Sequence, residues 1–293
     1  MPDDQLECVP VPTNEQRRQA AKRKLERQLA RRAERVKRRR ILAVVGSVVV
    51  VLLAVGGIYW LASGDDEQPP AADASETTTT TPAEPAETTD GACKFTTTPA
   101  EPAAKPVEVP PDPAEKVATG TLAVTLTTNN GDIPLTLDRA KAPCTVQSIE
   151  HLVTSKFYDD TPCHRIVHTD NFKVLQCGDP TGQGTGGPGY TIPDEKPTDL
   201  EAAPGAAGAV VYPRGVIAMA NTGAPNSGGG QFFLVYGSTF LSADYTIFGT
   251  IGEVGLATLD KIGAEGVDPA TDNGRGDGAP KLQTTITQAT IAQ

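Results

Sequence analysis

Three short motifs hold residue types that carry out common protein chemistry, but the sequence around each does not fit that chemistry. Residues 182–187 (GQGTGG) satisfy G-x-G-x-x-G, yet Pro188 follows at once, whereas a dinucleotide site needs a helix there. His164 and His168 have the spacing of a zinc-binding helix, but HRIVH has the pattern of a strand. Ser227 lies in a glycine-rich loop without the pattern of a hydrolase triad. We therefore expect no metal, no cofactor and no covalent catalysis.

Two longer segments, 161–195 and 215–251, together resemble the signature blocks of the cyclophilins, which are peptidyl-prolyl cis-trans isomerases. The first contains HR, then Q-x-G-D, then GTGG; the second contains MAN, GGQFF and FG. The resemblance covers most of 119–293 in the family's order. It implies a mainly β fold, a closed eight-stranded antiparallel barrel capped by two helices. It also implies isomerase activity on proline-containing polypeptides.

The resemblance assigns roles to individual positions. Arg165 matches the family's catalytic arginine, and Gln176 matches the glutamine that accompanies it. The expected substrate-binding residues line the peptide groove or the proline pocket; they are Phe172, Ala220, Asn221, Gln231, Phe233, Phe240, Leu241 and Tyr245.

These residue types suit the chemistry of an X–Pro bond. Amide resonance sets a rotation barrier of about 18–20 kcal/mol, so no nucleophile or proton shuttle is needed. A guanidinium directed at the imide nitrogen stabilises its lone pair as the nitrogen pyramidalises, and arginine stays charged with a fixed fork of donors. An apolar pocket around the proline ring excludes water and strengthens the interaction with Arg165.

The sequence also departs from the family pattern. An insertion near 168–171 leaves open whether Phe172 or Lys173 occupies the position of the pocket phenylalanine. Phe240 stands where tryptophan is usual, which resembles bacterial members with weak cyclosporin binding. The altered loop also leaves an alternative function, a Pro-peptide-binding module or chaperone without turnover. A further alternative is a structural tether that docks to a partner.

The elements that must position these residues follow from the hydrophobic pattern. Alternation on both sides of Asn129-Asn130-Gly131 predicts a β-hairpin. Pro143 begins a predicted helix that runs to Lys156, and a second helix is expected over 254–263. Predicted strands cover 163–168, 173–177, 215–220, 231–236, 246–251 and 281–291.

Charge divides the chain at residue 40. Residues 1–40 hold 13 Lys and Arg against 6 Asp and Glu, while the rest holds 13 against 30, within a total of −10. The 22 residues of 41–62 carry no charge, and a helix of that length spans about 33 Å, enough to cross a membrane. Flanking arginines place the N-terminus in the cytoplasm. We predict a single-pass signal-anchor; a cleaved signal peptide is the alternative.

The predicted domains are therefore a basic cytoplasmic tail (1–40), a transmembrane helix (41–62), a disordered linker rich in Pro, Thr and Ala (63–118) and an extracytoplasmic isomerase domain (119–293). We expect a monomer in the cell membrane with no nucleic-acid partner, because the acidic average opposes one.

Four cysteines lie on the predicted outer side, where an oxidising space permits two disulfides. They are Cys93, Cys144, Cys163 and Cys177. Strand alternation puts Cys163 and Cys177 on opposite faces, which disfavours that bridge unless a bulge intervenes. Pairing of Cys93 would pin the linker to the barrel, and free buried thiols remain an alternative.

Overall fold

The structure, a computed structural model, describes residues 85–292. The predicted tail (1–40), the predicted transmembrane helix (41–62) and the first part of the predicted linker (63–84) lie outside these residues. Among residues 85–292, no helix is long and apolar enough to cross a membrane.

Ten strands form one antiparallel sheet, in the order β13-β5-β6-β10-β9-β12-β3-β2-β14-β4. In chain order they are β2 (Thr121–Thr128), β3 (Gly131–Asp138), β4 (Thr161–Pro162), β5 (Arg165–Thr169), β6 (Phe172–Cys177), β9 (Val216–Met219), β10 (Phe232–Val235), β12 (Ile247–Ile251), β13 (Asp277–Gly278) and β14 (Thr285–Ile291). Two short pairs lie outside this sheet: β1 (Thr96–Thr97) with β7 (Tyr190–Thr191), and β8 (Val210–Tyr212) with β11 (Thr239–Leu241).

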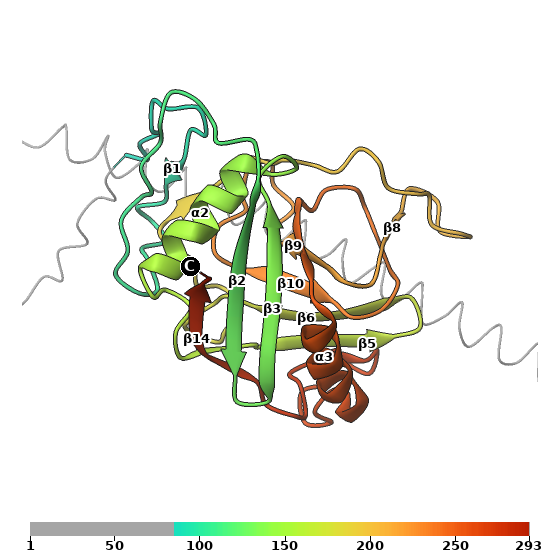
Figure 1. Ribbon diagram of the computed structural model, residues 1–293. Coiled ribbons are helices and arrows are strands. Elements are labelled where there is room, and N and C mark those ends of the chain that lie inside the picture. Colours follow the sequence, from blue (N-terminus) through green and yellow to red (C-terminus); the bar gives the residue numbers. More distant parts are fainter. Residues whose placement is uncertain (1–84, 293) are drawn as a thin grey trace, which may run out of the picture. The chain divides into compact units, whose positions relative to one another are not determined.

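The sheet is curled (Figure 1), and its strand count corrects the expected closed barrel of eight. Strands β4 and β5 belong to one run of chain, separated only by Cys163 and His164. The run bonds to β14 at its start and to β6 along the rest, so it bridges the two sides of the curl. The ladder is broken at those two residues, and β13 adds an edge strand beside β5. These two features account for ten strands in place of eight.

The predicted hairpin and both predicted helices are present. Strands β2 and β3 pair from Thr121 with Asp138 to Thr128 with Gly131, around the Asn-Asn turn. The helices are α2 (Pro143–Thr154), which packs against β14 and β3, and α3 (Glu253–Glu265), which packs against β3. Both lie against the curled sheet in Figure 1.

Alternation along the strands separates two apolar layers. Phe232 and Leu234 point into the main core, which also holds the inner residues of β2 and β3. Phe233 and Val235 point to the opposite face and pack with Val167 and Val174 in a second cluster. Partly exposed aromatic residues pack against this outer cluster, so it forms the floor of the site described below.

Residues 85–118, which we call the extension, do not fit the predicted disordered linker. Phe95 is fully buried, and its ring packs edge-on against Tyr190 at 5.8 Å between centroids. Asp112 accepts hydrogen bonds from the backbone N–H groups of Cys93 and Lys94, both at 2.8 Å. A proline-rich segment with few aliphatic residues is thus ordered by one aromatic side chain, one carboxylate and the covalent link described next.

Two disulfides join the four cysteines. The Cys93–Cys144 bridge ties the extension to α2. The Cys163–Cys177 bridge is also present, which corrects the expectation from strand alternation. Cys163 lies in the break between β4 and β5, and its N–H bonds to Thr284 rather than to β6. The alternation that would have turned its side chain outward is therefore lost at this position.

We predict that replacing Cys93 and Cys144 together by alanine frees the extension. The bridge spans 51 residues, and a link of this kind contributes about 2–4 kcal/mol to the free energy of unfolding. We expect a lower melting temperature and rapid protease cleavage within 85–118, read by mass spectrometry. Alanine suits both sites because each is buried. Unchanged melting and an uncut extension would contradict the prediction.

Candidate active site

Arg165 lies at the start of β5, directly opposite Gln176 on β6. Residues opposite each other in an antiparallel pair share a face, so the two side chains meet there. The Arg165 Nη1 donates to Gln176 Oε1 at 3.1 Å, and Nε and Nη2 donate to the two carboxylate oxygens of Asp277 at 2.7 and 3.0 Å. A guanidinium has five N–H donors, so two remain without a partner among the described residues.

Asp277 was not among the predicted site residues. It comes from β13, which pairs with β5, and the Asp272 carboxylate orders the preceding turn by accepting from the backbone of Gly274 and Gly276. The hydrogen bond from Arg165 lowers the pKa of Asp277, and the same bond raises the pKa of Arg165. The pair is therefore charged at every physiological pH. No motif around Asp277 signals this contact, because 112 residues separate it from Arg165.

A small pocket of about 130 Å³ opens beside Arg165. Its volume is that of roughly four water molecules, suited to a small ring. The residues that line it are Arg165, Phe172, Val174, Gln176, Ala220, Asn221, Phe233, Leu241 and Tyr245. The rings of Phe233 and Tyr245 meet edge-on at 5.4 Å, which gives the pocket an aromatic wall.

Strand register decides between Phe172 and Lys173. Phe172, Val174 and Gln176 alternate along β6 on one face, and all three line the pocket, whereas Lys173 does not. Phe240, predicted to bind substrate, lines neither this pocket nor the larger one beside it. It lies on β11, where its N–H bonds to the carbonyl of Asn171, so its role in substrate binding stays a prediction.

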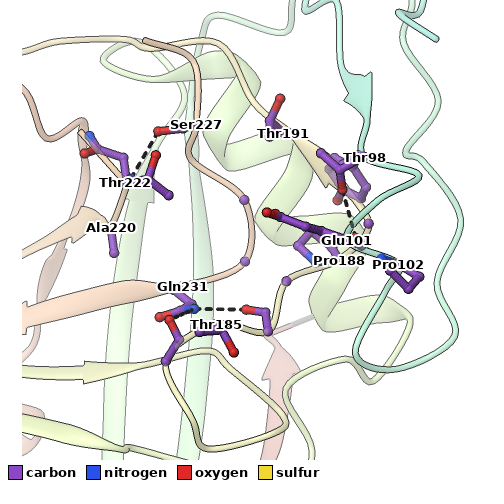
Figure 2. A pocket seen from close by; sticks show the side chains of 18 of the residues that line it. Thr98, Glu101, Pro102, Thr185, Pro188, Thr191, Ala220, Thr222, Ser227 and Gln231 are labelled. Carbon is purple, nitrogen blue, oxygen red and sulfur yellow. Dashed lines mark hydrogen bonds between the residues drawn. The ribbon is translucent and has the colours of Figure 1, made fainter. Parts of the chain in front are cut away.

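A second, larger cavity of about 510 Å³ adjoins the small pocket and shares Gln176, Ala220 and Asn221 with it. Gln231 lies between the two: it accepts a hydrogen bond from Gln176 at 3.0 Å. Its Nε2 donates to the carbonyls of Gly184 and Gly186, at 3.0 and 2.9 Å (Figure 2). A continuous chain of hydrogen bonds thus runs from Asp277 through Arg165 and Gln176 to the glycine-rich loop.

The glycine-rich loop 182–187 is a wall of this cavity. Asp179, fully buried, accepts hydrogen bonds from Thr181 and from the N–H of Gly184. Burial alone would raise the pKa of Asp179, but these bonds lower it overall, so the carboxylate stays ionised. Strand β7 follows the loop where a dinucleotide site would need a helix, so its glycines provide a tight turn around Asp179.

The two histidines of HRIVH lie in different surroundings. His168 Nδ1 is 3.0 Å from the Tyr236 hydroxyl, whereas both ring nitrogens of His164 are buried without a partner among the described residues. The pKa of His164 is lowered, mainly by burial; the negative charge of Asp179 opposes this with a smaller effect. Within residues 85–292, no three His, Cys, Asp or Glu side chains gather in a way that would hold a metal ion.

Comparisons with known proteins identify similar chains. The sequence profile described as cyclophilin type peptidyl-prolyl cis-trans isomerase/CLD matches residues 123–291. The chain is 51% identical over 308 residues to a probable peptidyl-prolyl cis-trans isomerase B of Mycobacterium tuberculosis, covering 98% of this chain and 96% of that one. It is 38% identical over 168 residues to peptidyl-prolyl cis-trans isomerase B of Streptomyces anulatus, covering 52% and 89%. A crystal structure of a Cryptosporidium parvum cyclophilin type isomerase aligns with a TM-score of 0.46 and 27% identity, over 59% of this chain and 99% of that one.

The buried His164 predicts a loss of stability in mild acid. Its pKa is lower in the folded chain than in the unfolded chain, so the unfolded state takes up a proton first as the pH falls. The free energy of unfolding should therefore decrease as the pH falls through about 6.5, the ordinary histidine value. Thermal melts between pH 8 and 5 measure this slope.

The matched variant is His164→Leu, which carries no titrating group. We expect it to flatten the dependence on pH, with a remainder from His168, whose pKa burial also lowers. An identical slope in the variant and the unaltered protein would show that His164 does not contribute.

Proposed function

The chain belongs to the cyclophilin-type peptidyl-prolyl cis-trans isomerase family, and on that premise we propose that Arg165 catalyses X–Pro isomerisation by acting on the imide nitrogen. The enzyme class follows from the family match and from identity over nearly the whole chain to a named isomerase. The mechanism rests on the arrangement of the pocket.

The observation that carries the mechanism is the hydrogen bonding of Arg165. Asp277 and Gln176 take up three of its five donors and fix the plane of the guanidinium, which leaves two N–H groups at the pocket. One of these donates to the imide nitrogen as the X–Pro bond twists, which reduces its double-bond character. An acceleration of 10⁵ needs about 7 kcal/mol, a size that a preorganised charged donor supplies in part.

The apolar wall supplies the rest of the arrangement. Phe172, Phe233 and Leu241 hold the proline ring and keep water from the guanidinium. Exclusion of water strengthens the attraction between Arg165 and the nitrogen lone pair, because the effective dielectric constant falls. Gln176 and Asn221 lie at the junction of the two cavities, where they orient the peptide backbone.

We further propose that the substrates are secreted or envelope proteins and that the chain is tethered to the cell membrane by 41–62. The charge difference across residue 40 and the uncharged run of 22 residues support this topology. The two disulfides add support from the folded part, since such bridges persist in oxidising compartments. No observation favours a binding module without turnover, because the pocket retains its arginine and its aromatic wall.

The catalytic proposal predicts that Arg165→Ala lowers kcat/KM on an X–Pro test peptide by about 10²-fold, the cost of removing one preorganised donor. The full-length protein in mild detergent is assayed by exchange NMR. Asp277→Asn should give a smaller loss of kcat/KM, about 3- to 10-fold. The substitution weakens the hydrogen bonds that orient the guanidinium, but Arg165 keeps its own charge.

Two further variants separate positioning from folding. Asp277→Glu keeps the carboxylate and should recover part of kcat, while melting temperatures report whether any variant is simply unfolded. Full activity of Arg165→Ala would refute the proposed role of the guanidinium.

The topology proposal predicts that protease added to spheroplasts digests 85–292 but spares a tag on residue 1. Replacing Val50 and Leu53 by arginine should release the protein from the membrane, since each central charge costs about 2.5–3.5 kcal/mol. Val50→Leu is the matched control and should remain membrane-bound. A tag that is cleaved along with the folded part would reverse the topology.

A further inference from the structure

The extension lies outside the region matched by the family profile, yet it contributes to the larger cavity. The profile begins at residue 123, whereas Thr98, Glu101 and Pro102 line the cavity beside the glycine-rich loop (Figure 2). One wall of this cavity is therefore built by a segment that precedes the region matched by the family profile.

Hydrogen bonds hold this wall in place. Residues 98–101 form a turn, in which the N–H of Glu101 bonds to the Thr98 carbonyl at 2.8 Å. The Thr98 hydroxyl donates to the Glu101 carbonyl at 2.9 Å. The backbone N–H of Thr98 bonds to Gly189, and that of Ala104 bonds to Gly187, both at 2.8 Å. The turn is thus attached on both sides to residues 187–189, at the end of the glycine-rich loop.

Close contact at Gly189 makes this attachment specific. Gly189 has φ of +81°, and a Cβ atom there would lie 2.9 Å from the backbone nitrogen of Ala103. A side chain would both strain the backbone and push the extension away. Upstream, the pairing of β1 with β7 and the Cys93–Cys144 bridge hold the same segment against the domain.

Glu101 is the one charged residue among those that line the cavity. Its carboxylate has no hydrogen-bond or ion-pair partner within residues 85–292, and in Figure 2 it extends into the space between Ala220 and Pro188. Arg165, which lines the adjoining small pocket, is already paired with Asp277. The cavity therefore offers one free negative charge within neutral walls.

We propose that Glu101, which the extension adds to the wall of the larger cavity, makes the enzyme prefer Lys or Arg near the isomerised proline. The inference rests on the proposed function and names its substrate class. The two cavities share Gln176, Ala220 and Asn221, so one extended peptide occupies both, and the basic residue lies within a few positions of proline. An acidic side chain at that position is repelled by Glu101.

The test uses the full-length protein and a set of X–Pro peptides in which Lys, Ala or Glu occupies each of three positions on either side of the bond. Exchange NMR gives kcat/KM, and NMR titration gives Kd. At one position, Lys should exceed Ala by about 2- to 5-fold and Glu should fall below Ala, the size of an exposed ion pair. Salt should reduce the difference, because the pair is partly open to solvent.

Variants connect the preference to Glu101. In Glu101→Gln, the ratio of kcat/KM for the Lys peptide to that for the Ala peptide should approach one. In Glu101→Lys, the Glu peptide should become the preferred substrate. Glu108→Gln is the matched control: it lies in the same extension, is exposed and does not line the cavity, so it should keep the unaltered ratio.

Failure of the Glu101 inference can be distinguished from failure of the proposed catalytic mechanism. Equal kcat/KM and equal Kd for Lys, Ala and Glu peptides at every position overturn the inference and leave the isomerase mechanism intact. A charge preference in Kd that disappears in Glu101→Gln supports the inference even if Arg165→Ala shows the proposed catalysis to be wrong.

Discussion

The register between β5 and β6 is the constraint on which the site depends. It sets Arg165 opposite Gln176 and places Phe172 and Val174 on the same face, so a shift of one residue would turn all of them into the core. Asp277 then fixes the guanidinium from a third strand, and Gln231 extends the same hydrogen-bonded chain to the glycine-rich loop. The small pocket and the larger cavity are consequently parts of one rigid arrangement.

The two disulfides act on different parts of this arrangement. The Cys163–Cys177 bridge joins residues close to Arg165 and Gln176, where the chain is interrupted between β4 and β5, so it links the start of β5 to the end of β6 covalently. The Cys93–Cys144 bridge holds the extension, whose turn at 98–101 forms a wall of the larger cavity. Oxidation therefore contributes both to the strand pair that holds Arg165 and Gln176 and to the wall of the larger cavity.

Local patterns were sufficient for most elements, whereas the residues of the small pocket came from the resemblance to the cyclophilins. The hairpin at Asn129-Asn130, both helices and the long strands follow from alternation and from turn residues. Arg165, Gln176 and Phe233, which the resemblance assigned to the site, line one pocket, whereas Phe240 lies outside it. Its neighbour Leu241 on the same strand β11 does line the pocket, because successive side chains of a strand point to opposite faces.

The sequence by itself indicated the enzyme class through the resemblance of 161–195 and 215–251 to the cyclophilins. It also predicted most elements, because short-range periodicity reports on neighbours a few positions apart. It identified an arginine with a glutamine and an apolar pocket, and it divided the chain by charge. The tertiary structure alone decided which groups from distant segments meet: Asp277 with Arg165 across 112 residues, Cys163 with Cys177 across a broken strand, and Glu101 with the cavity. Such contacts depend on how strands curl and pair. The composition of the extension predicted disorder, because the segment is rich in proline and is ordered by one buried side chain, Phe95, and one disulfide bridge.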